Sequence, residues 1–120
     1  MKLKIEQALQ QGIAAHKQGK LQDAEHLYRA ILQSQPANLN ANHSLGVMSV
    51  SVDKADGALP LFKTALESNP NIEQFWLSYI DALIKTEKFD DARQVIGQAK
   101  TQGVAEEKLN VLKSKLTPNV

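Results

Sequence analysis

The 120-residue sequence contains no cysteine. This absence excludes disulfide bonds, a thiolate nucleophile and the cysteine-ligated classes of zinc site. The sequence also lacks an excess of either charge, because 14 basic and 13 acidic residues leave a formal net charge of +1. A surface that follows a phosphate backbone needs clustered positive charge. We therefore expect no nucleic-acid partner.

Long apolar segments are missing as well. No apolar run approaches the roughly 20 residues that a membrane-spanning helix needs. The first residues, Met1 to Glu6, lack the apolar core of a signal peptide. We therefore expect a single soluble, cytoplasmic domain with no membrane partner.

Motifs of catalysis are absent too: the sequence has no glycine-rich phosphate loop, no nucleophile elbow and no HExxH. The adjacent carboxylates Asp90-Asp91 and Glu106-Glu107 fall in the first turns of predicted helices, where negative charge is favourable. A metal site needs several ligands that converge within bonding distance, with further side chains to support them, and we do not expect His16, His26 and His43 to form one. We predict that the chain is not an enzyme and has no catalytic residue, metal site or cofactor.

The sequence does contain an internal repeat, with one fixed spacing of about 34 residues, which we call the repeat period. The positions that recur at this spacing are Gly12 and Gly46 (then Ile80); Gly19, Asp53 and Glu87; Ala24, Ala58 and Ala92; Tyr28 and Phe62 (then Ile96); Ile31, Ala65 and Ala99; and Pro36 and Pro70. Agreement of six such sets in one register indicates internal repetition.

Apolar residues within each repeat follow the three- and four-residue spacing of an amphipathic helix. The pattern predicts seven helices and no strand, with turns near Gly19, Pro36, Asp53, Pro70, Glu87 and Gly103. Pro60 falls near the start of one helix, where the backbone amides have no partner within the helix. After Gly103 the period lapses, and we expect residues 104–116 to form a capping helix. Residues 117–120 are expected to be a tail or the start of a linker.

The repeated positions resemble the tetratricopeptide repeat. The residues that carry this resemblance are Gly12, Ala24, Tyr28 and Pro36; Gly46, Ala58, Phe62 and Pro70; and Trp76 and Ala92. The resemblance implies an all-α fold, a right-handed array of three helix-turn-helix repeats (about 5–38, 39–72 and 73–103) with a C-terminal capping helix, in one domain of residues 1–116. Departures from the motif are Gln11, Asn42, Ser49 and the absence of proline after the third repeat.

The same resemblance implies a concave groove lined by the first helix of each repeat. The residues expected there are Glu6, Leu9, Ile13, His16 and Lys17; Asn40, His43, Val47, Val50 and Ser51; and Gln74, Leu77, Asp81, Ile84 and Lys85. Leu9, Ile13, Val47, Val50, Leu77 and Ile84 would form an apolar strip along it. Exposed apolar strips mark contact surfaces, so we expect a protein-interaction module that binds a peptide or helix.

The kind of ligand follows from the positions at which some relatives hold a peptide carboxylate with cationic side chains. Those positions carry Leu9, Ile13, Ser44, Gln74 and Ser78, and none is a cation. A bound carboxylate would stay desolvated and unpaired, so we expect an apolar ligand. The cluster of Phe75, Trp76 and Tyr79 is expected to belong to the core, with Phe75 as its most exposed member.

Two alternatives remain open at this stage. The chain could self-associate as a homo-oligomeric scaffold. It could also be the N-terminal, partner-binding segment of a larger enzyme, since the runs Ala24–Arg29 and Phe75–Tyr79 resemble repeat segments of bacterial glycosyltransferase-like proteins.

Overall fold

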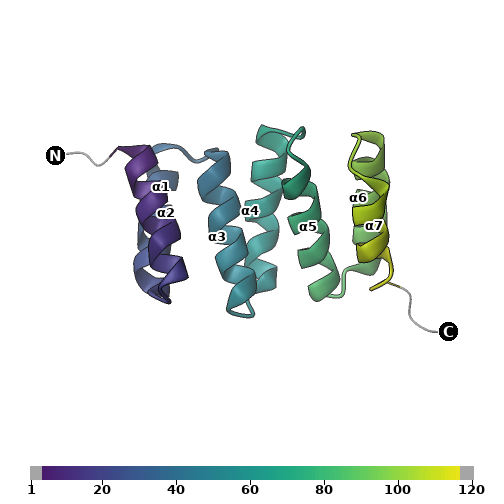
Figure 1. The fold of residues 1–120 in the computed structure, drawn as a ribbon, viewed down its shortest axis with the longest axis horizontal. Helices are drawn as coiled ribbons and strands as arrows, with labels where there is room; N and C mark the ends of the chain where they lie inside the picture. The colour runs from purple at the N-terminus through teal and green to yellow at the C-terminus, as the bar shows by residue number, and fades with distance from the viewer. Residues whose placement is uncertain (1–3, 117–120) are drawn as a thin grey trace.

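The computed structural model describes residues 4–116, which are entirely helical or in turns. The helices are α1 (Ile5–Lys17), α2 (Leu21–Ser34), α3 (Leu39–Ser51), α4 (Ala55–Ser68), α5 (Glu73–Lys85), α6 (Phe89–Thr101) and α7 (Glu106–Lys113). Figure 1 shows them side by side as an extended array, with α1 and α7 at opposite ends. The predicted all-α fold is confirmed, and within the described residues so are the seven helices without a strand. Residues 117–120, the predicted tail, lie outside the described part.

The helices keep the repeat period of the sequence. Helices α1, α3 and α5 begin one period apart, and so do α2, α4 and α6. Each first helix packs against its second helix, and each second helix packs against the first helix of the next pair. No helix in residues 4–116 is long and apolar enough to cross a membrane.

The turn that ends each first helix recurs with the same hydrogen bonds. At the end of α1 the amide of Gly19 donates to the carbonyl of His16 (3.0 Å), and that of Lys20 donates to Ala15 (2.8 Å). This pair of bonds defines the Schellman motif, which needs a positive φ at one residue. Gly19 has φ 80°, and the equivalent Asp53 and Glu87 have φ 62° and 61°. Two of the three turns therefore hold a side chain in the left-handed region.

Close packing explains the repeated small and aromatic residues. A Cβ atom added to Gly12 would lie 2.6 Å from the ring of Tyr28, and one added to Gly46 would lie 2.4 Å from the ring of Phe62. Both rings are buried. The third pair has buried isoleucines at both places, Ile80 and Ile96. Removing the ring makes room for a larger side chain on the facing helix.

Asn42, a departure from the repeat motif, makes the same connection as the tryptophan that replaces it in the next pair. The Asn42 side-chain amide donates to the carbonyl oxygen of Pro36 (3.0 Å). The indole N–H of Trp76 donates to the carbonyl oxygen of Pro70 (2.8 Å). Each bond ties a first helix to the proline that precedes it, so the link survives the change of residue.

The expectation that Phe75 is the most exposed aromatic of its cluster is wrong. Its side chain is only 4% exposed. It belongs to a core cluster that includes Leu109 and Leu112 of α7, and the ring of His43 lies 4.8 Å from its own. Sequence reasoning placed Phe75 on the surface because it did not foresee that α3 and α7 both contribute to this cluster.

Helix α7 takes the place of a further first helix after the third pair. The turn after α6 differs from those after α2 and α4: Gly103 has φ 92° and the amide of Val104 donates to the carbonyl of Ala99 (3.0 Å) in a Schellman motif. The equivalent residues Gln35 and Asn69 have φ −134° and −155°. Helix α7 then packs against α5 and α6, as α3 packs against α1 and α2. Val104 stands one repeat period after Pro70. The motif residues end at this point, but the geometry of the repeat continues into α7.

Candidate functional site: the inner groove

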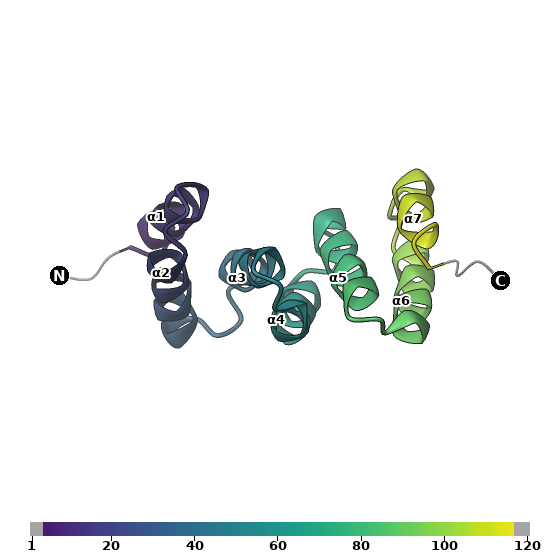
Figure 2. The ribbon, with the colours of Figure 1, turned by 90° about the horizontal axis from the view of Figure 1, so that it is seen from below.

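The first helices lie on one side of the array. Figure 2 shows α1, α3, α5 and α7 on this side and α2, α4 and α6 on the other. Neighbouring first helices are in contact with each other, α1 with α3, α3 with α5 and α5 with α7. We call the solvent-facing surface of α1, α3 and α5 the inner groove, because the predicted groove residues all lie on these helices.

The predicted apolar strip is less exposed than the sequence suggested. Ile13 is 36% and Val47 39% exposed. Leu9, Val50, Leu77 and Ile84 are half-buried because they also pack against the core clusters. The rest of the predicted set is polar, with Lys17, Asn40, Gln74 and Lys85 exposed and His16, His43 and Asp81 half-buried.

A pocket of about 220 Å³ lies in the groove between α3 and α5. Its lining residues are Val47, Val50, Phe62, Gln74, Ser78 and Asp81. Four of these were predicted to line the groove, Ser78 was named only as a position of the carboxylate site of relatives, and Phe62 was not predicted there. Phe62 reaches the groove from α4 because Gly46 leaves its ring room to pass under α3. The shortage of side-chain volume at Gly46 is the signal that could have identified it.

His43 joins the two helices that form the pocket. Its Nε2 atom lies 2.8 Å from the Ser78 hydroxyl oxygen, which also accepts a hydrogen bond from the Gln74 amide (3.1 Å). The imidazole ring lies near the rings of Phe62 (5.5 Å) and Phe75 (4.8 Å). Burial lowers the pKa of His43, which favours the neutral ring. His43 is therefore an uncharged part of the groove wall.

The charges of the groove are largely paired with each other. The Asp81 carboxylate accepts a hydrogen bond from Lys85 Nζ (2.6 Å) and lies 3.6 Å from Lys115 Nζ. Lys85, predicted to contact a ligand, is therefore already bound to Asp81. Lys17 is exposed at the far end of α1. Between α3 and α5 the wall thus presents apolar side chains and neutral polar groups, together with one compensated carboxylate.

Helix α7 adds a further apolar residue to the first-helix side. Val111 is 62% exposed and stands one repeat period after Leu77. Sequence reasoning missed it because the period was taken to end at Gly103. Within residues 4–116, no group of three or more His, Asp or Glu side chains is placed to hold a metal ion.

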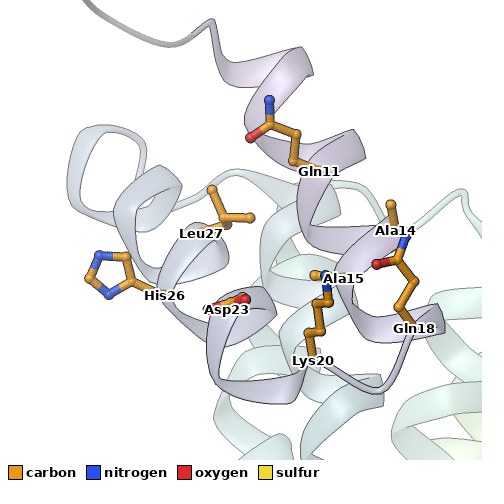
Figure 3. Close-up of a pocket in the computed structure, with 8 residues that line it drawn as sticks. All are labelled: Gln11, Ala14, Ala15, Gln18, Lys20, Asp23, His26 and Leu27. Atoms are coloured by element: carbon orange, nitrogen blue, oxygen red, sulfur yellow. The ribbon is translucent and has the colours of Figure 1, made fainter.

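A second cavity, of about 480 Å³, lies at the outer end of the array between α1 and α2. Figure 3 shows Gln11 and Ala14 on α1, with Gln18 just after its end, at this cavity. Lys20 and Asp23 lie nearby, and His26 points away from α1. Gln11 and Ala14 stand one repeat period before Leu45 and Met48, which are buried against the first pair. This end of the array therefore carries polar or small residues where an internal junction carries large apolar ones.

The fold agrees with known structures. The chain superposes on MamA from AMB-1 with a TM-score of 0.83 at 27% sequence identity, over 96% of this chain and 63% of that one. On MamA from MSR-1 it superposes with a TM-score of 0.82 at 27% sequence identity, over 96% of this chain and 66% of that one. The chain thus spans just under two thirds of these two MamA chains. The repeat domain of Sgt2 from Aspergillus fumigatus gives 0.78 at 18% identity, over 93% and 78% of the two chains, and shares the fold alone.

No curated protein sequence is significantly similar to this chain. Two family models described as tetratricopeptide repeat match it, over residues 50–116 and 9–49. The first of these extends through α7, in agreement with the continued geometry after Gly103. Because the matched residues span more than half of the sequence, the chain belongs to the tetratricopeptide repeat family.

Proposed function

We propose that this chain is a protein-interaction module that binds an apolar peptide or helix of a partner protein in the inner groove, across α3 and α5. The observation that carries this proposal is the pocket backed by Val47, Val50 and Phe62 in a wall without an uncompensated charge. Burial of apolar side chains contributes about 25 cal/mol per Å² before the costs of ordering the ligand. A partner with two or three apolar anchors at helical spacing suits such a surface.

Neutral groups at the pocket make a carboxylate a poor ligand. Ser78 and Gln74 offer hydroxyl and amide groups, and Lys85 is held by Asp81. An ionised C-terminus would lose water without gaining a charged partner. The bound peptide should therefore need no free C-terminus and should show weak salt dependence.

The test begins with a peptide selected from a displayed library against the wild-type protein. Its affinity is then measured by calorimetry for Val47→Asp and for Val52→Asp. Val52 is a matched control because it is also an exposed valine, at the end of α3 and outside the pocket. We expect Val47→Asp to weaken binding at least tenfold, or about 1.4 kcal/mol, and Val52→Asp to leave it within twofold.

Two results would contradict the proposal. Equal affinities of the two variants would place the ligand elsewhere, and a tenfold loss on amidating the peptide would reveal a carboxylate site. Light scattering over a range of protein concentrations tests the alternative of self-association. A mass that rises with concentration and returns to that of a monomer in Val47→Asp would make a second copy of the chain the occupant of the groove.

A further inference from the structure

A larger cavity, of about 530 Å³, lies on the other side of the array between α4, α5 and α6. Trp76 lines it and is fixed there by its hydrogen bond to Pro70. Leu66 of α4 and Val95 of α6 add apolar surface, and Tyr79 is half-buried at the same cavity. The walls therefore combine aromatic and aliphatic side chains with the polar residues Lys63, Glu67, Asp91, Gln94 and Gln98.

Two carboxylates stand at this cavity, Glu67 on α4 and Asp91 on α6. Burial raises the pKa of the Tyr79 hydroxyl, and the negative charges of Asp91 and Glu67 raise it further. Both carboxylates are therefore close enough to the tyrosine to act on it through space. The two acids come from different helices and line the same cavity as Tyr79.

Neither of these carboxylates has an ion-pair partner within the described residues. Several acidic groups elsewhere have basic partners: Asp90 pairs with Arg93, Asp81 with Lys85 and Glu73 with Lys108. Glu67 and Asp91 form no such ion pair or side-chain hydrogen bond in residues 4–116. Lys63 also lines the cavity and lies one helical turn before Glu67 but does not pair with it. The lining therefore carries two carboxylates and one ammonium group, which leaves an excess of negative charge at the cavity.

The first junction of the array shows that repeat packing does not require these charges. The residues one repeat period earlier are Gln33 for Glu67, Gly57 for Asp91 and Leu45 for Tyr79. Leu45 is fully buried, so the same place is filled there by an aliphatic side chain. The acids and the tyrosine are particular to the second junction, where they form an acidic, aromatic cavity.

We propose that this cavity binds an arginine side chain of a partner protein, with the guanidinium group between Glu67 and Asp91 and against the ring of Tyr79. A guanidinium is planar and carries five donors, so it can bond to two carboxylates while it stacks on an aromatic face. Its methylene groups would lie against Leu66 and Val95. This site is separate from the inner groove and takes a ligand of opposite character.

The single tryptophan of the chain provides a direct readout, because Trp76 lines the cavity. The probes are Nα-acetyl-arginine amide and its citrulline counterpart, which has nearly the same shape and no charge. We expect a saturable change of Trp76 fluorescence with the arginine probe, and at least tenfold weaker binding of the citrulline probe. Bound cation should also lower the pKa of Tyr79, measured from tyrosinate absorbance with Tyr28 as the internal reference.

The matched variants are Glu67→Gln with Asp91→Asn, and Asp90→Asn as control. Asp90 is the neighbour of Asp91 in sequence, is exposed, and pairs with Arg93 outside the cavity. The double variant should lose at least tenfold in affinity for the arginine probe, whereas Asp90→Asn should retain it. All positions are exposed, so an unchanged melting temperature will show that the fold is intact.

Equal binding of the two probes, arginine binding retained by the double variant, or no saturable binding would each overturn the proposal. The groove variant Val47→Asp must still bind the arginine probe as the wild type does. Loss of both binding events in that variant would show that the two surfaces are not separate and would contradict this inference, even if the groove function stands.

Discussion

In the first and second helix pairs a glycine of the first helix lies under an aromatic ring of the second, whereas the third pair has isoleucine at both places. The two arrangements keep the helices in one register while they redistribute side-chain volume across the interface. Gly46 with Phe62 opens a path from α4 to the inner groove. Ile80 with Ile96 closes that path in the third pair, where the aromatic residues lie elsewhere, at Trp76 and Tyr79.

The two ends of the array differ in the same way. At the α1 end Gln11 and Ala14 face an open cavity. At the other end α7 covers the third pair and contributes Leu109 and Leu112 to a core cluster that extends from α4 to α7. The proposed surfaces both lie in the part of the array between these ends, where neighbouring pairs meet. A repeat array thus obtains individual binding sites by changing a few residues at a junction and leaving the helical frame constant.

Substitutions at Gly46 test whether glycine–aromatic packing can be exchanged for isoleucine–isoleucine packing. Gly46→Ile should cost about 3 kcal/mol, because it forces a branched side chain into the ring of Phe62. Adding Phe62→Ile copies the third pair, and this double variant should recover more than about 1 kcal/mol. Urea denaturation measures both. Gly97→Ala, in an exposed helical position with open space around it, should stabilise by about 0.5–1 kcal/mol. A double variant no better than Gly46→Ile would show that the two packings are not interchangeable.

The turns that end the first helices also differ between the pairs, and here we expect smaller changes in the free energy of unfolding. Glu87→Gly should stabilise the protein by about 1 kcal/mol, because φ 61° costs a side chain with a Cβ about 1–2 kcal/mol. Gly19→Ala should destabilise by a similar amount, since Gly19 has φ 80° and no neighbour that a methyl group could contact. Thermal denaturation of the two variants measures both changes. A loss of stability in Glu87→Gly would mean that the Glu87 side chain stabilises the fold by more free energy than its positive φ costs.

At the end of the array that α7 covers, the attachment of α7 should depend on pH. The Glu73 carboxylate accepts hydrogen bonds from Lys108 Nζ (2.6 Å) and the Ala105 amide (2.9 Å). The hydrogen bond from Lys108 lowers the pKa of Glu73 most, and the hydrogen bond from Ala105 lowers it further. The stabilisation of α7 by Glu73 is therefore fully present above the pKa that Glu73 has in the unfolded chain. It is lost as the pH falls through the lower pKa that Glu73 has in the folded protein.

We expect the protection factors of the α7 amides, which correct the hydrogen-exchange rates for their intrinsic pH dependence, to fall on acidification more in the wild type than in Glu73→Gln. Burial lowers the pKa of His43, so protonation of His43 also opposes folding in acid. Since His43 is present in both proteins, the difference between them isolates Glu73. Identical pH profiles in α7 would show that the carboxylate does not hold the helix.

Much of this architecture could be predicted from the sequence, because its signals are local. The positions of Gly19, Asp53 and Glu87 predicted the three turns, and the spacing of apolar residues predicted the helices. The side chains at the junctions could not be placed in the same way. Phe75 is buried beside His43, in a core cluster that extends to Leu109 and Leu112, and all three are far from it in sequence. The half-burial of the apolar strip likewise depends on contacts between neighbouring pairs.

The residues of the proposed groove were predicted from their positions in the repeat, and the structure adds the contacts that each one makes. Val47, Val50, Gln74 and Asp81 lie at the groove pocket as their positions in the repeat implied. Phe62 was missed because it comes from a second helix, and Val111 because α7 lacks the motif residues. The pairing of Lys85 with Asp81 could not be inferred from position alone, since several rotamers of either side chain fit the same register.

The most direct test of binding in the inner groove is a map of backbone amide shifts in isotope-labelled protein titrated with the selected peptide. The proposal predicts the largest shifts at Val47, Val50 and Ser78, with Gln11 and Ala14 at the open end unchanged. Shifts confined to α2, α4 and α6 would contradict it, because the peptide would then bind on the side of the array that does not carry the groove.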